Sequence, residues 1–322
     1  MRLSLSWINI CKSVLNLFTL RNVFIALIFL GLPRGEAIAQ EIPQTPAPQP
    51  WPSITPTTPA AKAKLSEGLA IIQQGNLDGA IAQFQAAIAL DPLLWQAHYN
   101  LGLALGQRGD LLAAAQAFLE TIELQPNFAV AYGNLGGVLI DSQNWPQAEP
   151  YLRRALSLDP NLAIAHYNLG LIYRHQGNRD AAIQAWQKAR ELAPDFPDAT
   201  IQLAELYLAG DRPEAAQPLI QELLKSQPNL AAVHYLQGRW LAQQGDFAEA
   251  LQAFRASSER DPTYANAYFA AAQLLIKNNQ RAAAMPLLDY AHSLYGQQQQ
   301  APWLEAVQTL RQQIQSPKQG QK

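Results

Sequence analysis

The sequence predicts an all-α solenoid of seven tandem repeats that is closed by one further helix. Three observations predict this fold class. Landmark residues recur every 34 residues from residue 61 onward, without an insertion or a deletion. Side chains of similar size occupy the same positions in each repeat. The segment 299–315, which follows the last repeat, places its apolar side chains at helical spacing.

The composition sets limits on the function. The chain has 322 residues, of which 49% are hydrophobic and 15% charged, and its formal net charge is −2. Such a chain is too apolar to be disordered and is long enough to bury a sizeable core. A nucleic-acid-binding surface needs an excess of basic residues, which this chain lacks. The single cysteine, Cys11, excludes an internal disulfide and a zinc ribbon.

The first 39 residues have the pattern of a secretory signal peptide. Basic residues precede an apolar run at 23–32, and Ala37 and Ala39 form a small-x-small cleavage site. We therefore expect cleavage after Ala39 and export to the periplasm or cell envelope. The alternative is an uncleaved anchor in the inner membrane, although a span over 14–32 would place Arg21 in lipid.

Residues 40–60 are predicted to form an extended, proline-rich linker. Seven prolines between residues 43 and 59 fix φ and remove backbone donors, which forbids a regular helix or sheet. Such a segment favours the polyproline II conformation and serves as a spacer. A ligand for a peptide-recognition domain is the alternative interpretation.

The repeats occupy seven units: 61–94, 95–128, 129–162, 163–196, 197–230, 231–264 and 265–298. Position 20 is always Ala, position 8 is Gly or Ala, and position 24 is always large. Small residues at 8 and 20 let two helices approach closely, and the large side chain at 24 fills the space beside them. Position 32 is Pro in six units, where it ends the second helix, and Gly296 in the seventh.

This pattern resembles the tetratricopeptide repeat family, and the resemblance covers most of the chain. It implies a right-handed α-solenoid of seven 34-residue helix-turn-helix repeats, in which each unit buries its apolar face against its neighbours. It also implies that the first helices of the units line a concave groove that receives a protein or peptide partner.

The array is expected to end in a capping helix at 299–315, followed by a frayed tail at 316–322. Trp303, Val307, Leu310 and Ile314 lie on one side of this helix, which we expect to face repeat seven.

Prolines recur at position 22 of alternate units, as Pro150, Pro218 and Pro286. A missing N–H is tolerated only in the first turn of a helix. We therefore expect these three second helices to start late or to bend at the proline.

The sequence has no motif for catalysis. It lacks the Gly-x-Ser-x-Gly and His-Glu-x-x-His motifs, the phosphate-binding loop and the dinucleotide fingerprint. His98, His166 and His234 lie at position 4 of alternate repeats, too far apart to share a metal, so they are expected to pack in the core or between repeats. We expect no enzymatic activity, no cofactor and no metal.

The candidate binding residues follow from helical periodicity, because positions 2, 6, 9 and 13 of the first helix lie opposite its packing stripe. Position 6 is Asn in repeats two to four. These amides could hold an extended peptide backbone or could bond within the scaffold, and both interpretations stay open here. The predicted partner groove comprises Asn100, Asn134, Asn168, Tyr99, Tyr167, Leu103 and Leu171. Secondary candidates are Asp198, Glu205, Arg239 and Lys277.

The sequence therefore predicts a non-enzymatic scaffold or adaptor in the bacterial envelope that binds a partner segment in its concave groove. Leu65 and Leu69 stand where the family's clamp for a C-terminal carboxylate has Lys and Asn, so that mode is not supported. The alternative is an accessory subunit of envelope polysaccharide synthesis or export, or of another membrane-associated assembly. We expect no nucleic-acid partner, and membrane contact only if the N-terminal segment is retained.

Overall fold

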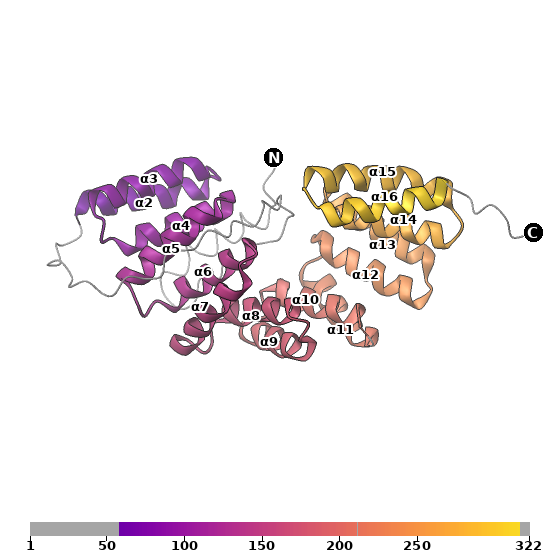
Figure 1. Cartoon of the computed structure of the whole chain (residues 1–322), viewed down its shortest axis with the longest axis horizontal. Coiled ribbons are helices and arrows are strands. Elements are labelled where there is room, and N and C mark those ends of the chain that lie inside the picture. The colour runs from indigo at the N-terminus through magenta and orange to yellow at the C-terminus, as the bar shows by residue number, and fades with distance from the viewer. Residues whose placement is uncertain (1–57, 211, 316–322) are drawn as a thin grey trace, which may run out of the picture. The chain divides into compact units, whose positions relative to one another are not determined.

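The computed structural model describes residues 58–210 and 212–315, and every regular element in these two ranges is helical (Figure 1). The expected signal peptide at 1–39, nearly all of the expected linker at 40–60 and the expected tail at 316–322 lie outside the described residues. No helix within the described ranges is both long enough and apolar enough to cross a membrane.

The chain divides into two compact units, which we describe separately. The described residues of the first unit, 58–192, form four helical hairpins in which each hairpin contacts the next (Figure 1). The hairpins are α2 (Pro59–Gln73) with α3 (Leu77–Leu90), α4 (Trp95–Arg108) with α5 (Leu111–Leu124), α6 (Ala129–Asp141) with α7 (Trp145–Leu158), and α8 (Ala163–His175) with α9 (Arg179–Leu192).

The described residues of the second unit, 193–210 and 212–315, continue the same pattern and add a final helix. Its elements are α10 (Pro197–Leu208), the 3-10 turn η1 (Pro213–Ala215), α11 (Ala216–Ser226), α12 (Ala231–Gln244), α13 (Phe247–Arg260), α14 (Ala265–Lys277), α15 (Arg281–Gln297) and α16 (Ala301–Gln315). The predicted fold class, an all-α repeat solenoid, is confirmed.

The close approach of the two helices in a hairpin depends on the glycine at position 8. The large side chain at position 24 lies directly over it. A Cβ on Gly102 would lie 2.8 Å from the Phe118 ring, and a Cβ on Gly170 would lie 2.3 Å from the indole nitrogen of Trp186. The Trp186 indole also donates a hydrogen bond of 3.0 Å to the Tyr167 carbonyl. A small residue at position 8 and a large one at position 24 therefore indicate a direct contact between these two positions.

The proline at position 32 ends the second helices, because it disfavours the helical conformation of the residue before it. Asp91 accordingly has φ −148° and ψ 93°, and its carboxylate accepts a hydrogen bond of 3.0 Å from the Leu93 amide. Repeat seven has Gly296 at this position, and α15 continues to Gln297.

Of the three second helices with a proline at position 22, only one starts late. α7 and α15 contain Pro150 and Pro286 but begin at Trp145 and Arg281, the same repeat position at which α3, α5, α9 and α13 begin. Both prolines are exposed, so water can bind the carbonyl that loses its helical partner. Only α11 starts late, after the turn η1.

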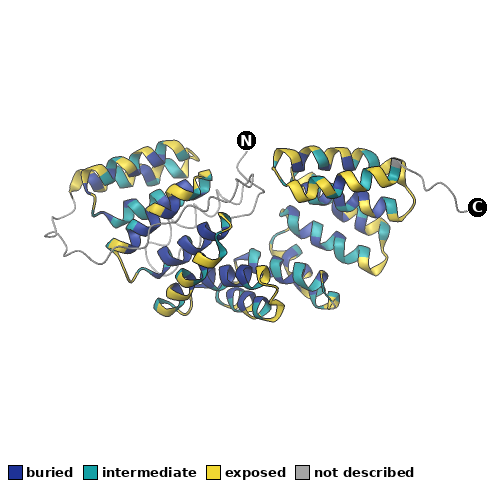
Figure 2. Ribbon diagram, in the orientation of Figure 1, coloured by how far each residue is buried: buried dark blue, intermediate teal, exposed yellow. Residues whose placement is uncertain are grey.

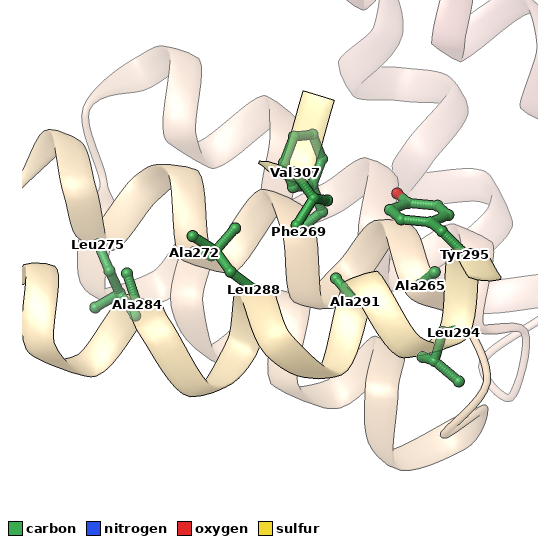
Figure 3. Close-up of a cluster of buried hydrophobic side chains, with 10 residues drawn as sticks. All are labelled: Ala265, Phe269, Ala272, Leu275, Ala284, Leu288, Ala291, Leu294, Tyr295 and Val307. Carbon is green, nitrogen blue, oxygen red and sulfur yellow. The ribbon is translucent and has the colours of Figure 1, made fainter. Parts of the chain in front are cut away.

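The last three helices share a core, in which Ala272 and Leu288 face each other between α14 and α15 (Figure 3). Val307 of α16 is fully buried and lies beside Phe269 (Figure 3). Leu310 and Ile314 are partly buried against the same cluster. Trp303 also faces repeat seven, because its ring stacks on Tyr295 and meets the ring of Phe269 edge-on, although the residue is 44% exposed.

Candidate functional site

Of the three first helices that carry the predicted partner groove, α4 and α6 have an accessible side. Residues at positions 6, 9 and 13 of α4 and at positions 2, 6 and 13 of α6 point to one side of each helix, because these spacings are close to whole helical turns. All six are half-buried, as expected for a surface that solvent and a ligand can reach. We call this surface the α4–α6 face: Asn100, Leu103, Gln107, Val130, Asn134 and Asp141.

The three position-6 asparagines form hydrogen bonds within the chain. Asn100 Nδ2 donates to the Gln96 carbonyl of its own helix at 2.7 Å. Asn134 Nδ2 donates to Tyr99 Oη at 3.2 Å, and Asn168 Nδ2 donates to the Gly133 carbonyl at 3.3 Å, so both link neighbouring repeats. An amide has two N–H groups and an acceptor oxygen. Within the described part of the chain, the second N–H and the oxygen of each amide form no further hydrogen bond.

Repeat four does not offer the surface that the sequence predicted. Gly133 and Gly137 let α8 approach α6 closely: a Cβ on Gly133 would lie 3.2 Å from Leu162 Cδ2, and one on Gly137 would lie 3.1 Å from Asn168 Nδ2. Asn168 is consequently 5% exposed and Leu171 only 3%. Most residues of α6 and α8 are buried (Figure 2). Helical periodicity describes one helix at a time, so it could not predict that α8 covers this side of α6. The two glycines four residues apart in α6 were the feature of the sequence that indicates such a close contact.

The two tyrosines predicted to flank the groove differ in their environments. Tyr167 is 5% exposed and belongs to the core. Tyr99 is half-buried, and its ring meets that of Phe128 edge-on at 5.1 Å between centroids. Burial raises the pKa of Tyr99 because the phenolate would be poorly solvated. Its hydroxyl therefore stays protonated at neutral pH and remains a hydrogen-bond donor beside Asn134.

Asp141 is the carboxylate of the α4–α6 face. It is the last residue of α6 and is half-buried. No described cation forms an ion pair with it. Burial raises its pKa to about 7, because the charged form loses solvation without gaining a partner. At neutral pH this group is therefore poised between its charged and neutral forms.

The secondary candidates lie in the second unit, where three of the four are half-buried on α10 and α12. The guanidinium carbon of Arg239 lies 5.7 Å from the centre of the Tyr235 ring. Burial raises the pKa of Tyr235, the charge of Arg239 opposes this shift, and the charge of Glu205 adds to it. Asp198 lies in the first turn of α10, and burial raises its pKa to about 6. Lys277 lies apart from these, with Nζ 5.4 Å from the centre of the Phe247 ring.

The position-4 histidines join consecutive repeats. Nε2 lies within 2.9 Å of the carbonyl oxygen of the preceding position-32 proline in His98 and His166, and within 2.8 Å in His234. In the described ranges, no group of three or more His, Cys, Asp or Glu side chains could hold a metal ion. The histidines therefore act as links between repeats.

Three further pairs of side chains, which the sequence did not lead us to expect, join the turn of one hairpin to the turn of the next. Trp145 stacks on His175 with 4.2 Å between ring centres and 8° between planes. Lys277 covers Phe247, and Arg108 pairs with Asp78 at 2.8 Å. The partners of each pair are 30 residues apart, and this recurring spacing in the sequence could have predicted the contacts.

Comparison with known proteins agrees with the repeat architecture. Family models described as tetratricopeptide repeat match residues 96–128, 127–195, 173–239 and 241–314, and one described as TPR repeat matches residues 68–109. No curated protein matches the sequence of this chain.

Solved structures show the same fold. A chain of the APC/C hetero-tetramer Cut9-Hcn1 is 18% identical, with a TM-score of 0.63 over 67% of this chain. The match covers 43% of that chain, so this chain spans less than half of it. A tetratricopeptide repeat protein from Parabacteroides merdae is 17% identical, with a TM-score of 0.62, and the match covers 80% of this chain and 99% of that one. At these identities the similarity establishes the fold alone.

Proposed function

Because the chain belongs to the tetratricopeptide repeat family, we propose that it is a non-enzymatic scaffold that binds a segment of a partner protein on the α4–α6 face. The fold implies protein or peptide partners, and proteins with these repeats generally act as scaffolds. The face is the part of the predicted groove in the first unit that remains accessible, because repeat four is closed by the contact of α8 with α6.

The observation that carries this proposal is the chemistry of the face. Asn100 and Asn134 each keep an amide donor and an acceptor, which together can pair with the N–H and C=O of an extended peptide. Leu103 and Val130 lie half-buried on the same side and supply apolar contact. Backbone pairing provides affinity for any extended segment, and the neighbouring side chains select among sequences.

The test uses the full chain and a phage-displayed library of random 12-residue peptides. Asn100→Ala is the cleaner of the two asparagine variants, because this amide bonds only within its own helix. We expect a selected peptide to bind this variant about 2- to 10-fold more weakly, as one or two hydrogen bonds are lost.

Leu112→Ser is the matched control. Leu112 is 58% exposed and lies on α5, away from the face. The control should bind the peptide like the wild type. Equal affinity of the wild type, Asn100→Ala and Leu103→Ala would contradict the proposal, provided that the variants melt as folded proteins.

We further propose that the scaffold works in the bacterial envelope after export. This proposal rests on the sequence, in which the apolar run at 23–32 precedes the cleavage pattern at Ala37 and Ala39. The mass of the protein from the envelope fraction should correspond to a chain that begins at Gln40. A mass that includes Met1 would instead support an anchored protein.

A further inference from the structure

We infer that Asp141 makes the α4–α6 face selective for a peptide with a lysine or arginine about three residues from the point where its backbone pairs with Asn134. The inference rests on the proposed function and adds the chemical class of the partner segment. Asp141 would act as a specificity-determining residue, and the asparagines would hold the backbone.

The spacing on α6 fixes where the basic residue should lie. Asn134 and Asp141 are on the same side of α6 and seven residues apart. Seven residues of helix rise by about 10 Å, which an extended peptide covers in about three residues.

The charge of Asp141 is not compensated within the described chain. Asp141 ends α6, where the negative end of the helix dipole disfavours a carboxylate. The arginines of α4, α7 and α8 have partners other than Asp141: Arg108 pairs with Asp78 and Asp110, Arg153 with Glu149, Arg154 with Ser157, and Arg174 lies over Trp186. The His175 ring stacks on Trp145. A cation from the partner is therefore the group that this surface lacks.

Asp198 differs from Asp141, because its position in its own helix favours the charged carboxylate. It too is half-buried on a first helix, but it lies in the first turn of α10, where the helix dipole favours negative charge. Glu123 is an exposed carboxylate on α5, away from the face, so a change there should not affect a peptide bound to α6. Glu123→Gln removes the same charge and is therefore the control for Asp141→Asn.

The experiment selects the same random 12-residue peptide library on the full-length wild type, Asp141→Asn and Glu123→Gln. We expect lysine or arginine to be enriched at one peptide position with the wild type and with Glu123→Gln. The enrichment should disappear with Asp141→Asn. In a selected peptide, replacing the basic residue with glutamine should weaken binding to the wild type about tenfold and change binding to Asp141→Asn less than twofold.

The outcomes separate the two proposals. Peptides that bind the face without a basic preference, or that prefer acidic residues, would overturn the selectivity and leave the scaffold function standing. A persistent basic preference with Asp141→Asn would do the same. Failure of the library to yield any peptide sensitive to Asn100→Ala would contradict both. The glutamine peptide tests the selectivity on the wild type alone, so the result does not depend on the stability of the variant.

Discussion

A pair of glycine substitutions tests the account of how the hairpins pack. Gly170 and Gly106 both lie in first helices and are buried, in α8 and α4. A Cβ on Gly170 would lie 2.3 Å from Trp186 Nε1, whereas a Cβ on Gly106 would lie 3.8 Å from the nearest atoms, in Ala114 and Val138. Alanine therefore adds a methyl group that has no room at Gly170 and has room at Gly106.

The two changes should have opposite effects on the free energy of unfolding. Alanine stabilises a helix by about 1 kcal/mol relative to glycine, so Gly106→Ala should stabilise the protein by about 0.5–1 kcal/mol. Gly170→Ala gains the same amount but overpacks the contact with Trp186, which costs about 1–3 kcal/mol. Shifting the indole also weakens its 3.0 Å bond to the Tyr167 carbonyl, at about 1 kcal/mol. Gly170→Ala should therefore destabilise the protein by about 1–3 kcal/mol.

Urea unfolding followed by circular dichroism at 222 nm measures both effects in the full chain. The midpoint should rise for Gly106→Ala and fall for Gly170→Ala. A neutral Gly170→Ala, or a destabilising Gly106→Ala, would refute the argument that the position-8 glycines are needed because of contact with position 24.

Three further predictions concern single side chains. Gln143 and Asn279 have φ of 61° and 58°, so Gln143→Gly and Asn279→Gly should each raise the free energy of unfolding by about 0.5–1 kcal/mol in urea titrations, and no gain would argue against the left-handed turn. Asn168→Ala removes a buried link between repeats and should cost about 1–2 kcal/mol, whereas Asn100→Ala should cost less than about 0.5 kcal/mol; equal costs would refute this distinction. Asp141 has a folded pKa raised to about 7, so the folded state holds a proton that the unfolded chain has lost, and the contribution of this group to stability should fall as pH rises from 4 to 7. Asp141→Asn should therefore stabilise the protein at pH 8 and not at pH 3, and melting curves that show no such difference would contradict the burial of this carboxyl.

The sequence was informative where a contact repeats with the 34-residue period. Position 24 faces position 8 in each hairpin, so Phe118 over Gly102 and Trp186 over Gly170 follow from residue size alone. The proline at position 32 likewise predicts where the second helices end. Both are local effects within one repeat, and the same residues recur often enough to be recognised.

The sequence was less informative where one repeat departs from the others. Asn134 and Asn168 occupy the same position, yet only Asn168 is buried, because Gly133 and Gly137 draw α8 onto α6. Pro150 was expected to delay or bend its helix, but α7 begins at Trp145, the same repeat position as the second helices without this proline. These outcomes depend on packing between neighbouring helices, which the period of a single helix does not contain.

Site-specific photo-crosslinking in the native host shows whether the α4–α6 face receives a partner segment. A photo-reactive phenylalanine analogue is placed either at Leu103, half-buried on the face, or at Leu112, 58% exposed on α5. The account predicts a crosslinked partner from position 103 and none from position 112. A product from position 112 alone would contradict it.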